Sequence, residues 1–192
     1  MNNLYLFLNI ITIFSTYLHI KYIESTNINE FKSLPDLLVD NLPDLSSNLI
    51  NKLVDYLLLL WTTPILFYGN NEMKGFMYKF TSIIFLLRTF TKFFTIIPSQ
   101  GKPCKNDSSK LECYISGYCN DKIFSGHTAI TLTCLLIIID NKLIDSRFNC
   151  LLKFFHLIYV FLILSAKNHY SVDVILSYII TTSLYYNLRD KL

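Results

Sequence analysis

Six apolar stretches, separated by polar segments, dominate this chain of 192 residues. They cover residues 4–20, 49–68, 76–97, 123–139, 151–166 and 170–186. A helix that crosses a bilayer needs about 20 mostly apolar residues, and it satisfies its backbone polar groups internally. The pattern therefore predicts an all-α, polytopic membrane protein: a single domain over residues 1–192, built as a six-transmembrane-helix bundle.

The composition agrees with a membrane protein. Hydrophobic residues make up 52% of the chain and charged residues 16%, and the mean hydropathy is +0.39. A soluble domain carries about a quarter charged residues. These values exclude a disordered tail, a nucleic-acid module and an ordinary cytosolic enzyme, so no nucleic-acid partner is expected. The net charge of +3 is too small to indicate an acidic partner.

Two features of the topology stay open at the level of the sequence. The first stretch could be a cleaved signal peptide, but it lacks a basic start and a small-x-small cleavage site, so we interpret it as a retained helix. Six helices place both termini on one side, yet lysine and arginine are balanced between the two sides, so the positive-inside rule does not orient the bundle.

Three cysteines, Cys104, Cys113 and Cys119, share the loop between the third and fourth stretches. Cysteines gathered in one loop are typical of an oxidising compartment, where two of them could pair. An odd number leaves one over, and the sequence does not specify the pairing.

Ionisable residues inside membrane helices are costly and are usually functional. His169 and Asp173 are four residues apart and share a helical face, so Asp173 can hold one ring nitrogen and leave the other as a nucleophile. Ser125, Gly126 and His127 open the fourth stretch. Gly126 allows close approach of a ligand, and the helix start offers N–H groups to an anion.

Arg88 lies in the third stretch, with Thr91 and Thr95 following at helical spacing. Arginine is the natural clamp for a phosphate oxygen. The third stretch ends on the side where the fourth and sixth begin, so we expect Arg88, His127 and His169 to converge at one membrane face. This set predicts phosphoryl transfer, in which one histidine attacks phosphorus and the other protonates the leaving oxygen.

A metal site is the second interpretation of two histidines and one aspartate. No third ligand follows at close spacing, so catalysis without a metal or organic cofactor is preferred. The other histidines, His19 and His156, are interpreted as interfacial residues, since neither has a partner that the sequence reveals.

Three ordered blocks resemble the sphingomyelin synthase family, a lipid-acting branch of the type 2 phosphatidic acid phosphatase superfamily. They are residues 88–98, residues 119–128 with Ser-Gly-His-Thr at their end, and residues 169–182 around the second histidine; the core of the resemblance runs over residues 35–186. Leu34-Pro35-Asp36 resembles the family's Pro-Asp signature better than the near-repeat at Pro43-Asp44. Asn120 departs from the family, which has glycine there.

The resemblance implies a catalytic triad of His127, His169 and Asp173. It implies phosphate or substrate contacts from Arg88, Thr95, Ser125, Gly126 and Asp55. Asp55 matches an acidic residue of the family's second helix only loosely, and a helix-capping role is the alternative. The family's active site faces the lumen or the cell exterior, with cytosolic termini, in the Golgi, endoplasmic reticulum or plasma membrane.

The implied activity is headgroup transfer through a phosphohistidine intermediate. The donor is phosphatidylcholine or phosphatidylethanolamine, the acceptor is ceramide and the released product is diacylglycerol. The sequence specifies neither the headgroup nor the oligomeric state, and a homo-oligomer remains open.

Two alternatives are kept. A lipid phosphate phosphatase of the same superfamily holds a dianionic monoester with a lysine and two arginines, but here those positions carry Thr81, Arg88 and Ile163. One remaining cation suits a singly charged phosphodiester better. An inactive scaffold or ceramide sensor is the alternative from another class, and the intact polar residues weigh against it.

Overall fold

The computed structural model describes residues 3–25, 33–94, 97 and 123–190. Thr95 and the three loop cysteines, Cys104, Cys113 and Cys119, lie outside these ranges. Within them the chain is all-helical and contains no strand, as the sequence predicts.

In the described residues, six long helices follow the six apolar stretches closely, and two short helical turns lie between them. The elements are α1 (Asn3–Ser25), α2 (Leu37–Asp40), α3 (Asn48–Tyr68), α4 (Asn71–Phe94), α6 (Gly126–Asp140), η2 (Ser146–Phe148), α7 (Asn149–Ser165) and α8 (Ser171–Leu188). The largest differences are five residues each: α1 ends at Ser25 instead of Ile20, and α4 begins at Asn71 instead of Phe76. The Asn70 side chain accepts the N–H of Met73 at 2.8 Å and so caps a polar first turn that an apolar count overlooks.

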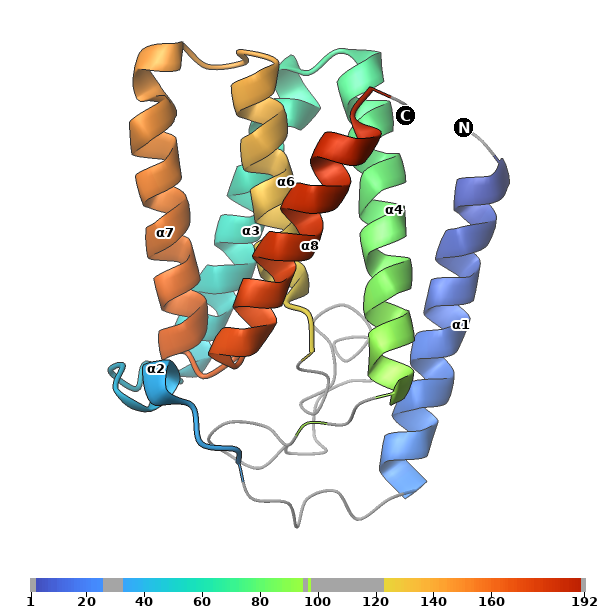
Figure 1. The fold of residues 1–192 in the computed structure, drawn as a ribbon, viewed down its shortest axis with the longest axis vertical. Coiled ribbons are helices and arrows are strands. Elements are labelled where there is room, and N and C mark those ends of the chain that lie inside the picture. Colours follow the sequence, from blue (N-terminus) through green and yellow to red (C-terminus); the bar gives the residue numbers. More distant parts are fainter. Residues whose placement is uncertain (1–2, 26–32, 95–96, 98–122, 191–192) are drawn as a thin grey trace.

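The long helices alternate in direction, and both ends of the chain lie at the same end of the bundle (Figure 1). Helix α6 is central, because it packs against α3, α4, α7 and α8. Most of its side chains are buried. Helix α1 lies outside and packs on α4, where the Asn9 amide donates to the Tyr78 hydroxyl at 2.7 Å. The first turn of α6 is therefore enclosed by the rest of the bundle.

Two described segments, Leu49–Tyr68 and Ser146–Ser165, are long and apolar enough to cross a membrane by length and composition. Leu6–Ser15 and Gly126–Asp140 are apolar helical stretches that are shorter than a span. The all-helical prediction is confirmed, whereas these lengths by themselves do not establish six membrane crossings.

A segment that we call the strap, residues 34–51, crosses the ends of α7 and α8 that face away from the chain termini. Hydrogen bonds along its whole length hold it there: Leu34 N–H to Tyr170 Oη at 3.0 Å, Lys167 Nζ to the Val39 carbonyl, Leu45 N–H to the Ser165 carbonyl at 2.8 Å, and Asn168 Nδ2 to Asn51 Oδ1 at 3.0 Å. The strap therefore fixes the connection that carries His169.

Asp36 is the polar centre of the strap. Its carboxylate accepts the N–H groups of Leu38 at 3.1 Å and Val39 at 3.0 Å, which caps α2, and that of Ser171 at 2.6 Å, which caps α8. Burial raises the pKa of Asp36, but these backbone donors outweigh burial and bring the pKa below its ordinary value of 3.8. Asp44, in the near-repeat, is exposed and accepts the Ser46 N–H at 2.9 Å.

We predict that Asp36→Asn lowers the free energy of unfolding by about 1–2 kcal/mol at neutral pH, because an amide cannot accept from both helix starts. A carboxyl whose folded pKa is lowered contributes stability above its unfolded pKa, and this contribution disappears as the pH falls through the folded pKa. The difference from the native protein should therefore shrink below about pH 4. Thermal unfolding in detergent at several pH values measures it.

Asp44→Asn is the matched control, since it changes the same residue type in the same Leu-Pro-Asp sequence. It should leave the melting temperature unchanged. Equal effects of the two substitutions would contradict the role given to Asp36.

Candidate active site

The starts of α6 and α8 are joined directly to each other. The Ser125 N–H donates to the Asp173 carbonyl at 3.5 Å. The Ser177 hydroxyl lies within hydrogen-bond distance of the Ser125 carbonyl, at 3.1 Å, and of the Asp173 carbonyl, at 2.7 Å. Ser125, Asp173 and Ser177 are fully buried. These bonds set the separation of the two helix starts on which the histidines lie.

The turn into α6 has an unusual backbone. Phe124 has a φ of 68°, in the left-handed region that favours glycine. Its ring is buried in the core with Phe80 and Ile84 of α4, and this packing offsets the strain. Ser125 then caps the helix, because its Oγ accepts the Thr128 N–H at 3.3 Å. The turn therefore places the first residues of α6 beside the start of α8.

The His127 and His169 rings lie 6.5 Å apart between centroids, at an interplanar angle of 63°. They come from the first turn of α6 and the residue pair before α8, at the end of the bundle opposite the chain termini. His169 is buried, with 5% of its surface exposed, and His127 is half-buried. The two rings are close enough to contact opposite sides of one phosphate.

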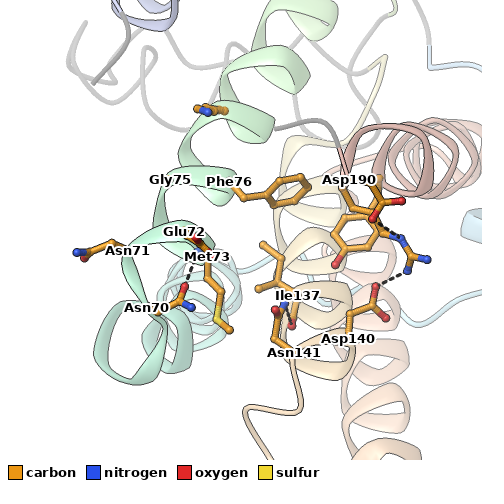
Figure 2. A pocket seen from close by; sticks show the side chains of 13 residues that line it. Asn70, Asn71, Glu72, Met73, Gly75, Phe76, Ile137, Asp140, Asn141 and Asp190 are labelled. Carbon is orange, nitrogen blue, oxygen red and sulfur yellow. Dashed lines mark hydrogen bonds and ion pairs between the residues drawn. The ribbon is translucent and has the colours of Figure 1, made fainter.

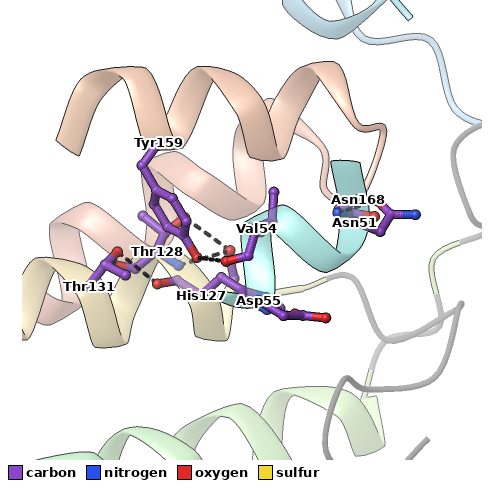
Figure 3. Close-up of polar contacts among 9 residues, drawn as sticks. Asn51, Val54, Asp55, His127, Thr128, Thr131, Tyr159 and Asn168 are labelled. Carbon is purple, nitrogen blue, oxygen red and sulfur yellow. Dashed lines mark hydrogen bonds and ion pairs between the residues drawn. The ribbon is translucent and has the colours of Figure 1, made fainter. Parts of the chain in front are cut away.

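Each histidine has a carboxylate beside it. His127 Nε2 lies 2.9 Å from Asp55 Oδ1, and Figure 3 shows how α3 brings Asp55 beside the start of α6. His169 Nδ1 lies 3.6 Å from Asp173 Oδ2, which also accepts the Tyr170 N–H at 3.0 Å. Asp55 sits in the second turn of α3 and contacts a histidine, so the capping role that the sequence left open is not what the structure shows.

Arg88 and Gly126 fit against one another. A β-carbon built on Gly126 would lie 2.6 Å from Arg88 Nη1, so the guanidinium occupies the space that any larger residue would need. Arg88 is buried, and its carbonyl accepts the Thr91 hydroxyl at 2.8 Å. The opening that the sequence assigned to a ligand at Gly126 is therefore filled by the arginine. Thr95 lies outside the described residues.

The prediction for His156 was wrong. It is 1% exposed, in the interior of the bundle, and both ring nitrogens have partners: Thr131 Oγ1 at 3.1 Å and Tyr178 Oη at 2.6 Å. The partners belong to other helices, which is why the sequence did not reveal them. The His19 side chain is outside the described part of the chain.

Sequence reasoning also missed Ser177, whose hydroxyl contacts the Ser125 carbonyl and so joins α8 to the start of α6. It lies within the block of residues 169–182, but its type gave no signal beyond a small residue on a buried face. Among the described residues, no group of three histidine, cysteine, aspartate or glutamate side chains is arranged to hold a metal ion.

A cavity of about 760 Å³ lies at the other end of the bundle, between the start of α4 and the ends of α6 and α8. Figure 2 shows its lining of mixed charge, where Asp140 Oδ2 accepts from Arg189 Nη1 at 2.9 Å. None of the described candidate site residues lines this cavity. The histidine pair therefore defines the candidate site, and the cavity is separate from it.

Comparisons with known proteins bear on this pair of histidines. Residues 118–190 match the family described as PAP2 superfamily C-terminal, a range that contains His127, His169 and Asp173. Sphingomyelin synthase-related 1 of Caenorhabditis elegans is 26% identical over 181 residues, which cover 81% of this chain and 37% of the relative. Sphingomyelin synthase-related protein 1 of Homo sapiens is 26% identical over 182 residues, which cover 83% of this chain and 44% of the relative.

The chain thus spans about two fifths of the length of the curated relatives that it matches. The three motif blocks, the family match and the relatives agree with one another. The resemblance found in the motifs is confirmed: the chain is similar to proteins named sphingomyelin synthase-related, and its residues 118–190 match the family described as PAP2 superfamily C-terminal.

Proposed function

We propose that this chain is a membrane-embedded lipid phosphotransferase that moves a phosphocholine or phosphoethanolamine headgroup from a glycerophospholipid to ceramide. The observation that carries the proposal is the pair of histidine rings, 6.5 Å apart, each with its own carboxylate. Two such rings can serve one phosphorus atom from both sides of an in-line displacement.

The surface of the bundle supports a place within the membrane. Large apolar side chains point outward along three of the long helices, including Leu59, Leu60 and Phe67 of α3, Phe154, Leu157 and Phe161 of α7, and Ile175 and Ile179 of α8. Exposed apolar surface of this extent marks contact with lipid or with a partner. In the proposed arrangement all six long helices cross the bilayer, and the histidine pair faces the lumenal or exoplasmic leaflet.

His169 is the proposed nucleophile. Asp173 beside Nδ1 holds the ring so that Nε2 can attack phosphorus with its lone pair. A bond forms between Nε2 and phosphorus, and the bond from phosphorus to the diacylglycerol oxygen breaks. His127, whose Nε2 lies 2.9 Å from Asp55 Oδ1, is the proposed acid and gives a proton to the departing oxygen.

The second step reverses these roles. The primary hydroxyl of ceramide attacks the phosphorus of the phosphohistidine, and the bond from His169 Nε2 to phosphorus breaks. His127, left neutral by the first step, takes the hydroxyl proton. Protons and charges therefore balance over the cycle, and the enzyme returns to its starting state.

The charge near the site favours a phosphodiester over a phosphate monoester. Arg88, packed on Gly126 at the start of α6, is the proposed clamp for one phosphate oxygen. Ile163, at the position of an arginine in the phosphatase branch, is fully buried with Val54 and Tyr159. A single clamping cation matches the single negative charge of a phosphodiester.

We predict that purified protein in detergent or nanodiscs converts fluorescent ceramide to a headgroup-bearing product when a glycerophospholipid is supplied. His169→Ala should reduce the rate about 1,000-fold or more, since it removes the nucleophile. Arg147→Gln, in the exposed turn at the other end of the bundle, is the control and should keep the native rate. Chromatography of the products against each donor lipid measures transfer.

The same assay separates the alternatives. Inorganic phosphate released from phosphatidic acid would identify a phosphatase. Binding of ceramide with no product from any donor would identify a sensor or scaffold. Native activity in His169→Ala would contradict the mechanism, even if transfer itself occurs.

We predict that Gly126→Ala slows transfer about 10- to 100-fold while the protein stays folded, because the added methyl displaces only the flexible end of Arg88 and so moves the clamp. Gly75→Ala is the matched control. Gly75 is also helical, and a β-carbon there meets nothing within 4 Å. Equal rates for the two variants would contradict the role proposed for Arg88.

A further inference from the structure

His156 is a buried ionisable residue that the proposed mechanism does not use. It lies in α7, and its two ring nitrogens contact α6 and α8, through Thr131 Oγ1 at 3.1 Å and Tyr178 Oη at 2.6 Å. The Trp61 ring of α3 makes a T-shaped contact with it, at 5.5 Å between centroids. One imidazole of α7 therefore contacts three other helices, and its partners Thr131 and Tyr178 lie beyond the first turns of α6 and α8.

The direction of these hydrogen bonds follows from the donors available. The Thr131 hydroxyl lies 2.8 Å from the His127 carbonyl and 3.3 Å from the Thr128 carbonyl. Carbonyl oxygens can only accept, so the hydroxyl proton points to these carbonyls, of which that of His127 is the nearer. Thr131 Oγ1 must then accept from His156 Nε2–H. In a neutral ring the other nitrogen, Nδ1, accepts from the Tyr178 hydroxyl.

A neutral ring fits these surroundings. An imidazolium buried in the bundle would need a carboxylate partner, and the described contacts of His156 are with hydroxyl groups and aromatic rings. The chain of bonds thus runs in one direction, from Tyr178 through His156 and Thr131 to the carbonyl of His127.

The same face of α7 also supports Asp55. One turn along the helix from His156, the Tyr159 hydroxyl donates to the Val54 carbonyl at 3.3 Å, directly before Asp55 (Figure 3). Helix α7 therefore holds the backbone of both members of the His127–Asp55 pair, through Thr131 on one side and Val54 on the other.

We infer that His156 is a positioning residue for His127: as the neutral Nε2–H tautomer it holds Thr131 and, through it, the first turn of α6. The expected effect on kcat rests on the proposed function, whereas the tautomer of His156 does not depend on it. It predicts that loss of the Nε2–H donor lowers kcat with little change in KM, because His127 touches the leaving oxygen and not the lipid chains.

Two substitutions of His156 separate positioning from simple packing. The glutamine amide reaches the place of Nε2 and can donate to Thr131, whereas the asparagine amide reaches only the place of Nδ1 and leaves Thr131 without this donor. We expect His156→Gln to keep kcat within about 3-fold of the native value and His156→Asn to lose about 10-fold or more. A residue that only fills space would show equal losses.

Thr131→Val tests the next bond and keeps the volume of the side chain nearly constant. It should reproduce the loss of His156→Asn, and in its presence glutamine and asparagine at position 156 should give equal rates. Thr133→Val is the matched control. Thr133 is buried on the same helix and donates to the Ala129 carbonyl at 2.7 Å, one helical turn back, as Thr131 does to His127.

The ¹⁵N NMR shifts of the histidine rings in nanodiscs give a readout that is independent of activity. The inference requires a protonated Nε2 and an unprotonated Nδ1 at His156 in the native protein. An Nδ1–H tautomer or a doubly protonated ring would overturn it, whether or not the protein transfers headgroups. An active native protein with equal kcat in His156→Asn would also overturn it, whereas an inactive native protein would contradict only the proposed function.

Discussion

The hydrogen bonds between the starts of α6 and α8 are the constraint on which the candidate site depends. Ser125 donates to the Asp173 carbonyl, and Ser177 reaches the carbonyls of both residues. All three side chains are fully buried, where an unsatisfied polar group costs about 1–3 kcal/mol, so the helix starts cannot separate without a large penalty. His127 follows Ser125, and His169 precedes Asp173. The backbone bonds between these turns therefore set the separation of the two histidines before any substrate binds.

The surroundings of the two histidines differ in a way that suits their proposed roles. His169 is buried and Asp173 fully so, whereas Asp55 beside His127 is 54% exposed. A nucleophile enclosed by the bundle and covered by the strap is shielded from water, which favours attack on its phosphoryl adduct by a lipid alcohol over hydrolysis. His127, the proposed acid, is half-buried and lies beside the exposed Asp55, so it is the more accessible of the two rings.

The positions of the helices could be predicted from the sequence because an apolar run of this length has few other solutions. The predicted helix starts are wrong where a polar side chain caps a helix. Asn70 caps an earlier start of α4, and Asp36 caps the short α2 within a segment expected to be a loop. The His169–Asp173 pair could also be predicted, since four residues on one helix share a face whatever the rest of the chain does.

Partners on different helices could not be derived in this way. His127 and Asp55 are 72 residues apart, and the family resemblance suggested both as site residues without pairing them. Thr131 and Tyr178 were invisible as partners of His156, which was therefore misinterpreted as interfacial. The sequence alone determined which segments are helical and which residues share a face, because both depend on local periodicity. Only the tertiary structure decided which faces meet, because lateral packing depends on side-chain fit and buried hydrogen bonds between segments that are distant in the chain.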